Sequence, residues 1–226
     1  MPRTLVFQGY ITSLIEAWKT ELKNKTFRIK LILMPGLFFA YSAITQQLGD
    51  YVEMRQGIRL SDRLLDLFPT QDFSVYIFML LYASLFTVLI THFNRPKVVL
   101  RVLEMHLFVA IVRQICILLL ALEPPVGMIV LRDIFLENTV YPKHAPMTKD
   151  LFFSGHAASI WIYFLCAEKK YLKTLFFAAT VLMGFMLLSM RIHYSYDVFG
   201  AIFFTTLIYV MPTKVRSYFL RLKQWP

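Results

Sequence analysis

The sequence has few charged residues and only two cysteines. Asp, Glu, Lys and Arg make up 17% of the 226 residues, whereas apolar residues make up 58%. A soluble domain of this length carries a more polar surface, so the composition argues against a soluble protein. Cys116 and Cys166 both lie within apolar runs, which argues against a disulfide framework and against a zinc site built from cysteines.

Acidic residues are also scarce, with 14 Asp and Glu against 24 Lys and Arg and a formal net charge of +10. Such a charge would suit nucleic acid, but the basic residues cluster at the ends of apolar runs and form no basic patch within a soluble domain. At these positions they orient the chain and contact anionic lipid headgroups. We therefore predict membrane lipids and no nucleic acid as partners.

The sequence consists largely of long apolar runs, and several of them approach the roughly 20 residues that cross a bilayer core. No small-residue cleavage site follows the first run, so it reads as an anchor and not as a removed signal peptide. The prediction is an all-α polytopic membrane protein with six transmembrane helices and both termini cytoplasmic. The six expected spans are 29–48, 73–91, 98–122, 151–167, 171–190 and 196–211.

The predicted spans divide the chain into three parts. Residues 1–28 are expected to form a cytoplasmic, interfacial amphipathic helix, because Leu14, Ile15, Trp18 and Leu22 recur at helical spacing; a plain cytosolic tail is the alternative. Residues 29–211 are the six-helix catalytic domain, and 212–226 are a basic cytoplasmic tail. Because no soluble module precedes the first span, we expect a bacterial inner membrane protein before one of the Golgi or plasma membrane.

The basic residues predict the orientation of the spans. One side of the predicted membrane domain collects sixteen of them: Arg3, Lys19, Lys23, Lys25, Arg28, Lys30, Arg95, Lys97, Arg101, Lys169, Lys170, Lys173, Lys214, Arg216, Arg221 and Lys223. The other side collects seven: Arg55, Arg59, Arg63, Arg132, Lys143, Lys149 and Arg191. The side with sixteen is therefore cytoplasmic, and His156, His193 and Asp197 face the exoplasmic side.

Three ionisable residues are brought to that side by two antiparallel spans. His193 and Asp197 are four apart, so a helical segment would place them on one face, where the carboxylate would fix the imidazole tautomer. Alternatively, each residue caps the end of a span. His156 follows Ser154 and Gly155 at a helix start that suits a phosphate, although a lone histidine on an apolar helix is often structural. Two histidines and an aspartate could also bind a metal; we predict no metal and no cofactor.

These residues carry a resemblance to a known family. Asp150-Leu-Phe-Phe-Ser154-Gly155-His156 and His193-Tyr194-Ser195-Tyr196-Asp197-Val198 resemble the two active-site motifs of the sphingomyelin synthase family, a branch of the type 2 phosphatidic acid phosphatase superfamily. More loosely, the segment from Arg113 to Glu123-Pro124-Pro125 resembles the third span of that family. Departures are Ala157 in place of threonine, Lys149 in place of glycine, and Arg191 in place of an acidic residue.

The resemblance implies a mechanism. His193 would be the nucleophile, Asp197 its orienting carboxylate, and His156 the acid and base. Ser154, Gly155, Asp150, Arg113 and Tyr194 would contact the substrate. Arg113 either binds lipid phosphate or pairs with Glu104, and Asn94-Arg95-Pro96 is read as a turn beside the membrane and not as a phosphatase motif.

The expected function is therefore an integral membrane enzyme that moves a phosphocholine- or phosphoethanolamine-type group from a glycerophospholipid to a lipid alcohol such as ceramide, with diacylglycerol as product. A lipid phosphate phosphatase, or a phospholipase C-like hydrolase with water as acceptor, is the alternative. A non-catalytic scaffold or transporter is the third. The sequence leaves open the donor head group, the acceptor, the balance of transfer and hydrolysis, the oligomeric state and the organism. A homo-oligomer is one of the possible states.

Overall fold

The regular secondary structure of the described chain consists of helices. A computed structural model describes residues 3–132 and 147–222, and over these residues the all-α prediction is confirmed, with one isolated bridge between Ile58 and Leu122. The elements in chain order are α1 (Arg3–Leu22), α2 (Lys25–Met54), the 3₁₀ turn η1 (Leu65–Leu67), α3 (Ser74–His92), α4 (Pro96–Leu119), α6 (Gly155–Cys166), α7 (Lys170–Ser189) and α8 (Ser195–Leu222).

Four of the described helices, namely α2, α3, α4 and α7, are long and apolar enough to cross a membrane. Helix α6 has 12 residues, which gives about 18 Å at 1.5 Å per residue, well short of a bilayer core. The apolar part of α8 covers Ser195–Met211 and is also short. The structure therefore fits a polytopic membrane protein, whereas six spans and the side of each terminus stay predictions.

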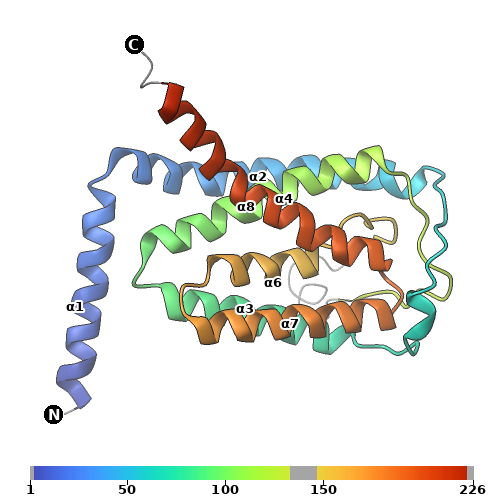
Figure 1. The fold of residues 1–226 in the computed structure, drawn as a ribbon, viewed down its shortest axis with the longest axis horizontal. Helices are drawn as coiled ribbons and strands as arrows, with labels where there is room; N and C mark the ends of the chain where they lie inside the picture. The colour runs from blue at the N-terminus through green and yellow to red at the C-terminus, as the bar shows by residue number, and fades with distance from the viewer. Residues whose placement is uncertain (1–2, 133–146, 223–226) are drawn as a thin grey trace.

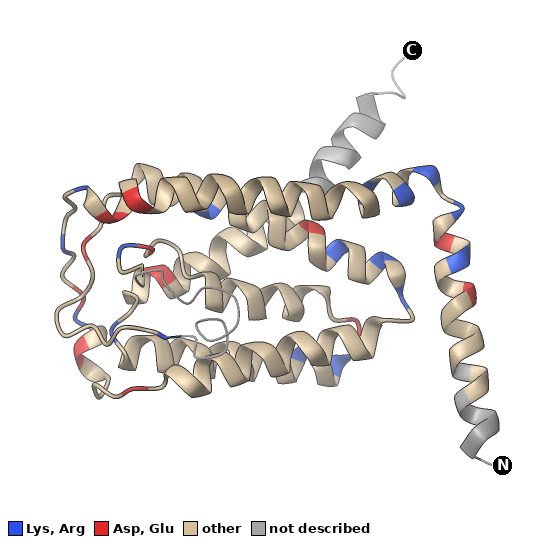
Figure 2. Ribbon diagram, turned by 180° about the vertical axis from the view of Figure 1, so that it is seen from behind, with Lys and Arg blue, Asp and Glu red and all other residues tan. Residues whose placement is uncertain are grey.

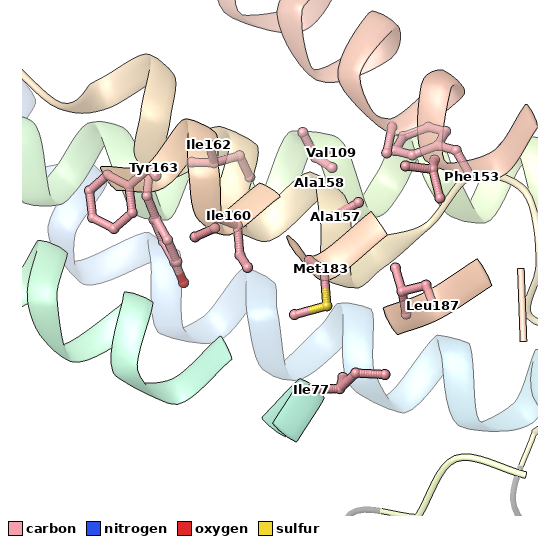
Figure 3. Close-up of a cluster of buried hydrophobic side chains, with 14 of the residues drawn as sticks. Ile77, Val109, Phe153, Ala157, Ala158, Ile160, Ile162, Tyr163, Met183 and Leu187 are labelled. Atoms are coloured by element: carbon pink, nitrogen blue, oxygen red, sulfur yellow. The ribbon is translucent and has the colours of Figure 1, made fainter. Parts of the chain in front are cut away.

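Helix α6 lies at the centre of the bundle, in contact with α3, α4, α7 and α8. Ala157, Ala158, Ile160 and Ile162 are all at most 1% exposed. Figure 3 shows these side chains among those of the neighbouring helices, with Met183 of α7 beside them. A helix covered on every side by protein is apolar all round. This explains why the sequence of α6 predicts a membrane span although the helix is an internal core element.

The N-terminal helix stands apart from this core. Figure 1 shows α1 running across one end of the bundle, crosswise to α2. The side chain of Asn24 accepts hydrogen bonds from the N–H groups of Thr26 and Phe27 and so starts α2. Helix α2 therefore begins four residues before the expected start of the first span at residue 29. The position of α1 in the membrane interface stays a prediction.

The long helices alternate in direction, so the bundle has two ends. The α3–α4 and α6–α7 turns lie next to α1, whereas the starts of α6 and α8 and the ends of α2, α4 and α7 meet at the other end (Figure 1). The expected return of the chain from His156 to the same end at His193 is thus observed. Figure 2 shows Lys and Arg on the helix ends nearest α1 and also on the loops at the far end.

At the end of the bundle far from α1, two helices end at other residues than predicted. Helix α2 continues to Met54, six residues past the expected end of the first span, and α4 stops at Leu119 instead of residue 122. The guanidinium of Arg55, directly after α2, donates to the carbonyl oxygens of Ile117, Leu118 and Leu120 and so caps α4. Because these last carbonyls are satisfied by Arg55, the helix ends before Glu123-Pro124 is reached.

Candidate active site

His193 and Asp197 form a buried hydrogen-bonded pair. The Nδ1 atom of His193 lies 3.1 Å from Oδ2 of Asp197, and the two residues are 4% and 0% exposed. The same Oδ2 accepts the backbone N–H of Tyr194 at 2.9 Å. With Nδ1 bonded to a carboxylate, the Nε2 atom of His193 carries the free lone pair.

The spacing predicted that the two residues lie on one helical face, and this prediction is wrong. Helix α8 begins at Ser195, so His193 precedes it in the α7–α8 loop and Asp197 is in its first turn. The contact is made because the N–H of Asp197 donates to the carbonyl of Tyr194 at 3.0 Å, which folds the loop back onto the helix start. The reading of both residues as simple caps is not favoured, since Asp197 accepts from the imidazole of His193 as well as from the backbone.

A backbone hydrogen bond joins the two motifs. The N–H of Ser154 donates to the carbonyl oxygen of Asp197 at 3.1 Å. Ser154 is fully buried, and its hydroxyl accepts the N–H of Ala157 as the cap of α6. This geometry favours a structural role for the Ser154 side chain, and its contact with substrate stays a prediction.

Arg113 of α4 holds the segment that precedes α6. Its Nη2 lies 2.7 Å from Oδ2 of Asp150 and 3.3 Å from the carbonyl oxygen of the same residue, and its Nε donates to the carbonyl of Phe153 at 2.7 Å. The alternative pairing with Glu104 is wrong, because Glu104 pairs with Lys30 at 2.7 Å. The predicted span start at residue 151 is also wrong by four residues, since Arg113 holds this segment outside the helix, which begins at Gly155.

Gly155 is the residue that admits this guanidinium. A Cβ atom at this position would meet Cζ and Nε of Arg113 at 3.3 Å. Gly155 was expected to contact the substrate; within the described structure it lets Arg113 approach the backbone.

Replacing Gly155 by Ala is therefore expected to displace Arg113 from Asp150 and Phe153. We expect kcat/KM to fall about tenfold, the effect of weakening one charge-assisted hydrogen bond. Gly36→Ala in α2 is the matched control, because the added methyl group would meet no atom within 4 Å beyond its chain neighbours and the nearby backbone of its own helix. Steady-state kinetics of both variants is the measurement, and equal activity would show that the position of Arg113 does not matter.

Asp150 pairs with Arg113 and is close enough to both histidines to feel their charge. Burial raises the pKa of Asp150, but the charge and hydrogen bond of Arg113 lower it by more, with smaller contributions from His193 and His156, so that the net pKa lies below its usual value. Because the folded pKa is lowered, this ion pair contributes stability at neutral pH that is lost as the pH falls through the lowered value. Both histidines are thus electrostatic neighbours of the same carboxylate.

His156 is the second residue of α6 and is partly buried. Its ring packs edge-on against Phe78 of α3, with centroids 5.8 Å apart. Its proximity to Asp150 places it on the same side of the site as His193. The structure therefore brings His156, His193, Asp197, Asp150 and Arg113 to one end of the bundle. The motif spacing predicted this for His156, His193 and Asp197.

Tyr194, an expected substrate contact, lies in the protein interior. It is 1% exposed, and its hydroxyl accepts the N–H of Leu60 at 3.2 Å and donates to the carbonyl of Glu123 at 2.9 Å. Burial raises the pKa of this hydroxyl. The geometry favours a structural role that ties two loops to the α7–α8 turn, and contact with substrate stays untested.

Several polar residues that support the site were not singled out from the sequence. The carboxylate of Asp62 accepts hydrogen bonds from the N–H of Ser195 at 2.6 Å and from the hydroxyl of Ser195 at 3.0 Å. Asp62 thus caps α8 from the α2–α3 loop. Glu53 accepts the N–H groups of Thr148 and Lys149 at 2.6 and 2.7 Å. Both Asp62 and Glu53 belong to the acidic residues within 49–72. Their number in one short segment was the only sequence pattern that indicated a role beyond that of an exposed loop.

Lys149, noted in the sequence as a departure from the family pattern, also supports the site. Its ammonium lies 2.8 Å from the carboxylate of Glu123 and donates to the carbonyl of Arg55. This ammonium, and the N–H of Gly57 that Glu123 also accepts, lower the pKa of Glu123. Lys149 thus joins the loop after α4 to the segment that leads to Asp150.

No described group of three His, Cys, Asp or Glu residues is placed to hold a metal ion, within 3–132 and 147–222. Cys116 and Cys166 are both free. The site as described consists of acid–base groups and one guanidinium.

Comparison with known proteins adds one match. Residues 148–214 match the family model described as PAP2 superfamily C-terminal, and this segment contains both histidine motifs. The match covers well under half of the chain; it supports the PAP2 superfamily and does not distinguish its branches. The comparison with curated proteins gave no match, and the comparison with solved structures also gave none.

Proposed function

We propose that this chain, whose segment 148–214 matches the PAP2 superfamily, is a membrane-embedded phosphotransferase of the sphingomyelin synthase type. It would move a phosphocholine- or phosphoethanolamine-type group from a glycerophospholipid to a lipid alcohol such as ceramide. The observation that carries the proposal is the buried pair of His193 and Asp197, tied to the start of α6 by the bond from Ser154. The family match supports chemistry on phosphate esters in general.

In the first half-reaction, Nε2 of His193 attacks the phosphorus of the donor lipid. A nitrogen–phosphorus bond forms, and the bond from phosphorus to the glycerol oxygen breaks. His156 donates a proton to that oxygen, so diacylglycerol leaves as a neutral alcohol. Asp197 stabilises the positive charge on the imidazole of His193.

In the second half-reaction, the neutral His156 takes the proton from the acceptor hydroxyl. The acceptor oxygen then attacks phosphorus, the nitrogen–phosphorus bond breaks, and the free imidazole of His193 is restored. Protons balance over the two steps, because His156 gives one and takes one. Covalent catalysis divides one difficult transfer into two easier ones.

Arg113 is the proposed phosphate ligand. Its Nε and Nη2 atoms are used by Phe153 and Asp150, and no hydrogen bond among the described residues uses Nη1. The side chain is 16% exposed, which leaves this nitrogen to a phosphate oxygen. The first turn of α6 lies beside it and adds the positive end of a helix dipole.

One assay separates the proposal from its two alternatives. The purified protein is incubated with head-group-labelled phosphatidylcholine or phosphatidylethanolamine, with and without ceramide, and in a separate arm with phosphatidic acid. Label that moves to ceramide supports transfer. Release of the labelled phospho-head-group into water supports the hydrolase, and loss of phosphate from phosphatidic acid supports the phosphatase, which the family match allows equally. An absence of change in every arm would favour a scaffold or transporter and overturn the proposal.

Replacing His156 by Ala is expected to slow both half-reactions by about 10²- to 10⁴-fold, the usual contribution of general acid–base catalysis. A donor with a better leaving group needs no proton from His156, so it should restore the first step in this variant and leave the second slow. Rapid-quench measurement of diacylglycerol release and product formation tests this. An equal defect with both donors would show that His156 is not the leaving-group acid.

The sidedness of the bundle is also proposed, from the sixteen basic residues expected on one side and seven on the other. Cysteine introduced at Ser217 should be protected from a membrane-impermeant thiol reagent in intact cells, and one introduced at Gly127, in the loop after α4, should react. The reversed pattern would place the active site on the cytoplasmic face. A bacterial inner membrane location, lipid partners and a homo-oligomer remain proposals of the same kind.

A further inference from the structure

Tyr41 lies in α2, outside the segment 148–214 that matches the PAP2 family model. Helix α2 packs along α4 (Figure 1). The partly buried Tyr41 side chain donates its hydroxyl hydrogen to the carbonyl oxygen of Ala110 in α4, at 3.2 Å. The mechanism proposed above gives this hydroxyl no role.

The bond from Tyr41 to Ala110 is weak and dispensable. Its length of 3.2 Å exceeds the distance of about 2.7–2.8 Å that is usual between a hydroxyl donor and an oxygen acceptor. Ala110 lies inside α4, where its carbonyl also accepts the N–H of Gln114 in the helix ladder. Loss of the bond therefore leaves no α4 carbonyl unpaired, and the Tyr41 hydroxyl can exchange this acceptor for another.

The Tyr41 hydroxyl lies beside the ion pair of Arg113 and Asp150. Ala110 precedes Arg113 by three residues, which is less than one turn of α4. The Tyr41 oxygen is close enough to both members of the ion pair to feel their charges. The Nη1 atom of Arg113 is used by no hydrogen bond among the described residues. A phosphate oxygen on Nη1 would therefore have the Tyr41 hydroxyl nearby.

A contact near the end of α2 fixes this helix relative to the ion pair. The carboxylate of Glu53 accepts the N–H groups of Thr148 and Lys149, at 2.6 and 2.7 Å. These two residues lead directly into Asp150. Tyr41 thus belongs to a helix that is held against the segment carrying Asp150, which positions its hydroxyl before any ligand binds.

The phosphate of a phospholipid is a better acceptor for this hydroxyl than the carbonyl of Ala110. A phosphodiester shares one negative charge between two non-bridging oxygens, whereas the carbonyl is neutral. Hydrogen bonds to a charged acceptor are shorter and roughly twice as strong as those between neutral groups. Exchange of the carbonyl for a phosphate oxygen is therefore favourable.

We propose that Tyr41 is a second ligand of the donor phosphate. When the lipid binds, the Tyr41 hydroxyl leaves the carbonyl of Ala110 and donates to a phosphate oxygen beside Nη1 of Arg113. The inference rests on the phosphate-binding role proposed for Arg113, and it adds a residue of α2 to the site. It does not depend on the acceptor, because the donor phosphate binds before ceramide or water reacts.

Equilibrium binding to the full chain tests the proposal. His193→Asn removes the proposed nucleophile, so dioctanoylphosphatidylcholine and dioctanoylphosphatidylethanolamine bind without reaction. Their Kd values are measured in detergent micelles with and without Tyr41→Phe in this background. We expect Tyr41→Phe to raise Kd about tenfold for both lipids, the effect of one hydrogen bond to a charged group. The two lipids respond alike because they share the phosphate.

A ligand without phosphate and a second tyrosine serve as controls. Tyr41→Phe should leave the Kd of dioctanoylglycerol unchanged, because this lipid carries no phosphate. Tyr51→Phe, also in α2 but at a residue that is 57% exposed, should leave every Kd unchanged. Thermal unfolding should show the same stability with and without Tyr41→Phe, since the ring is kept and the carbonyl of Ala110 keeps its helix bond.

Three outcomes would overturn the proposal. The first is an unchanged Kd of the phospholipids in Tyr41→Phe. The second is an equal rise in the Kd of dioctanoylglycerol, which would show that Tyr41 only supports the packing of α2 on α4. The third is an absence of phospholipid binding to the His193→Asn protein, which would also remove the role of Arg113. If binding depends on Tyr41 but no label moves in the transfer assay, the phosphate site stands and the proposed transfer fails.

Discussion

Replacing His193 by Ala is expected to abolish both the transfer of the head group and the covalent intermediate. The Nε2 atom of this imidazole is the proposed nucleophile, and the other candidate ring, His156, has the role of acid and base. Without the nitrogen–phosphorus bond, neither half-reaction can begin. The measurement is the acid-labile label that remains on the protein after brief incubation with phosphorus-labelled donor lipid.

The Ala variant leaves the buried Asp197 without its partner and thereby destabilises the fold, so a second variant is needed. In His193→Asn the side-chain amide can still donate to Oδ2 of Asp197, but it cannot attack phosphorus. Retained helicity and thermal stability in the Asn variant, together with the loss of label, would attribute the loss to chemistry. Label that persists on either variant would show that another residue is the nucleophile.

The helices of the bundle were predictable from the sequence, but several of their ends were not. Runs of apolar residues predict where a chain is buried or in lipid, and they gave α2, α3, α4 and α7 within a few residues. The end of α4 depends on Arg55, which is more than 60 residues away in the sequence. No local pattern near Leu119 contains this contact.

The length of an apolar run also does not say what covers it. The sequence around Ile160 predicts a membrane span of 17 residues, but α6 has 12 residues, and four other helices surround it. Protein and lipid are both apolar environments, so composition alone does not separate them. The number of membrane crossings is the part of the fold that the structure leaves as a prediction.

In the candidate site, the residues of the two motifs could be found but not their orientations. His193 and Asp197 were predicted as a pair, and the structure places them in contact. Tyr194 was assigned to substrate because it lies within the motif, yet its side chain faces the protein interior. Asp62 was missed because its partner Ser195 is 133 residues away and only the fold brings them together.

Replacing Asp197 by Asn is expected to preserve the fold and to lower turnover by about 10⁴-fold, as when the carboxylate behind a catalytic histidine becomes an amide. The amide oxygen can still accept from Nδ1 of His193 and from the N–H of Tyr194. It carries no charge, however, and it no longer stabilises the imidazolium that forms as phosphorus is attacked.

The structure also predicts the cost of this change to stability. The Oδ1 atom of Asp197 is buried and accepts no hydrogen bond from the described residues, so the new amide group would be an unpaired donor costing about 1–3 kcal/mol. The measurement is pre-steady-state formation of the protein-bound label, together with thermal unfolding. Asp66→Asn is the control, because the Asp66 side chain is 72% exposed at the same end of the bundle. If Asp197→Asn forms the label as fast as the unsubstituted chain, the carboxylate only caps α8, and His193 acts without it.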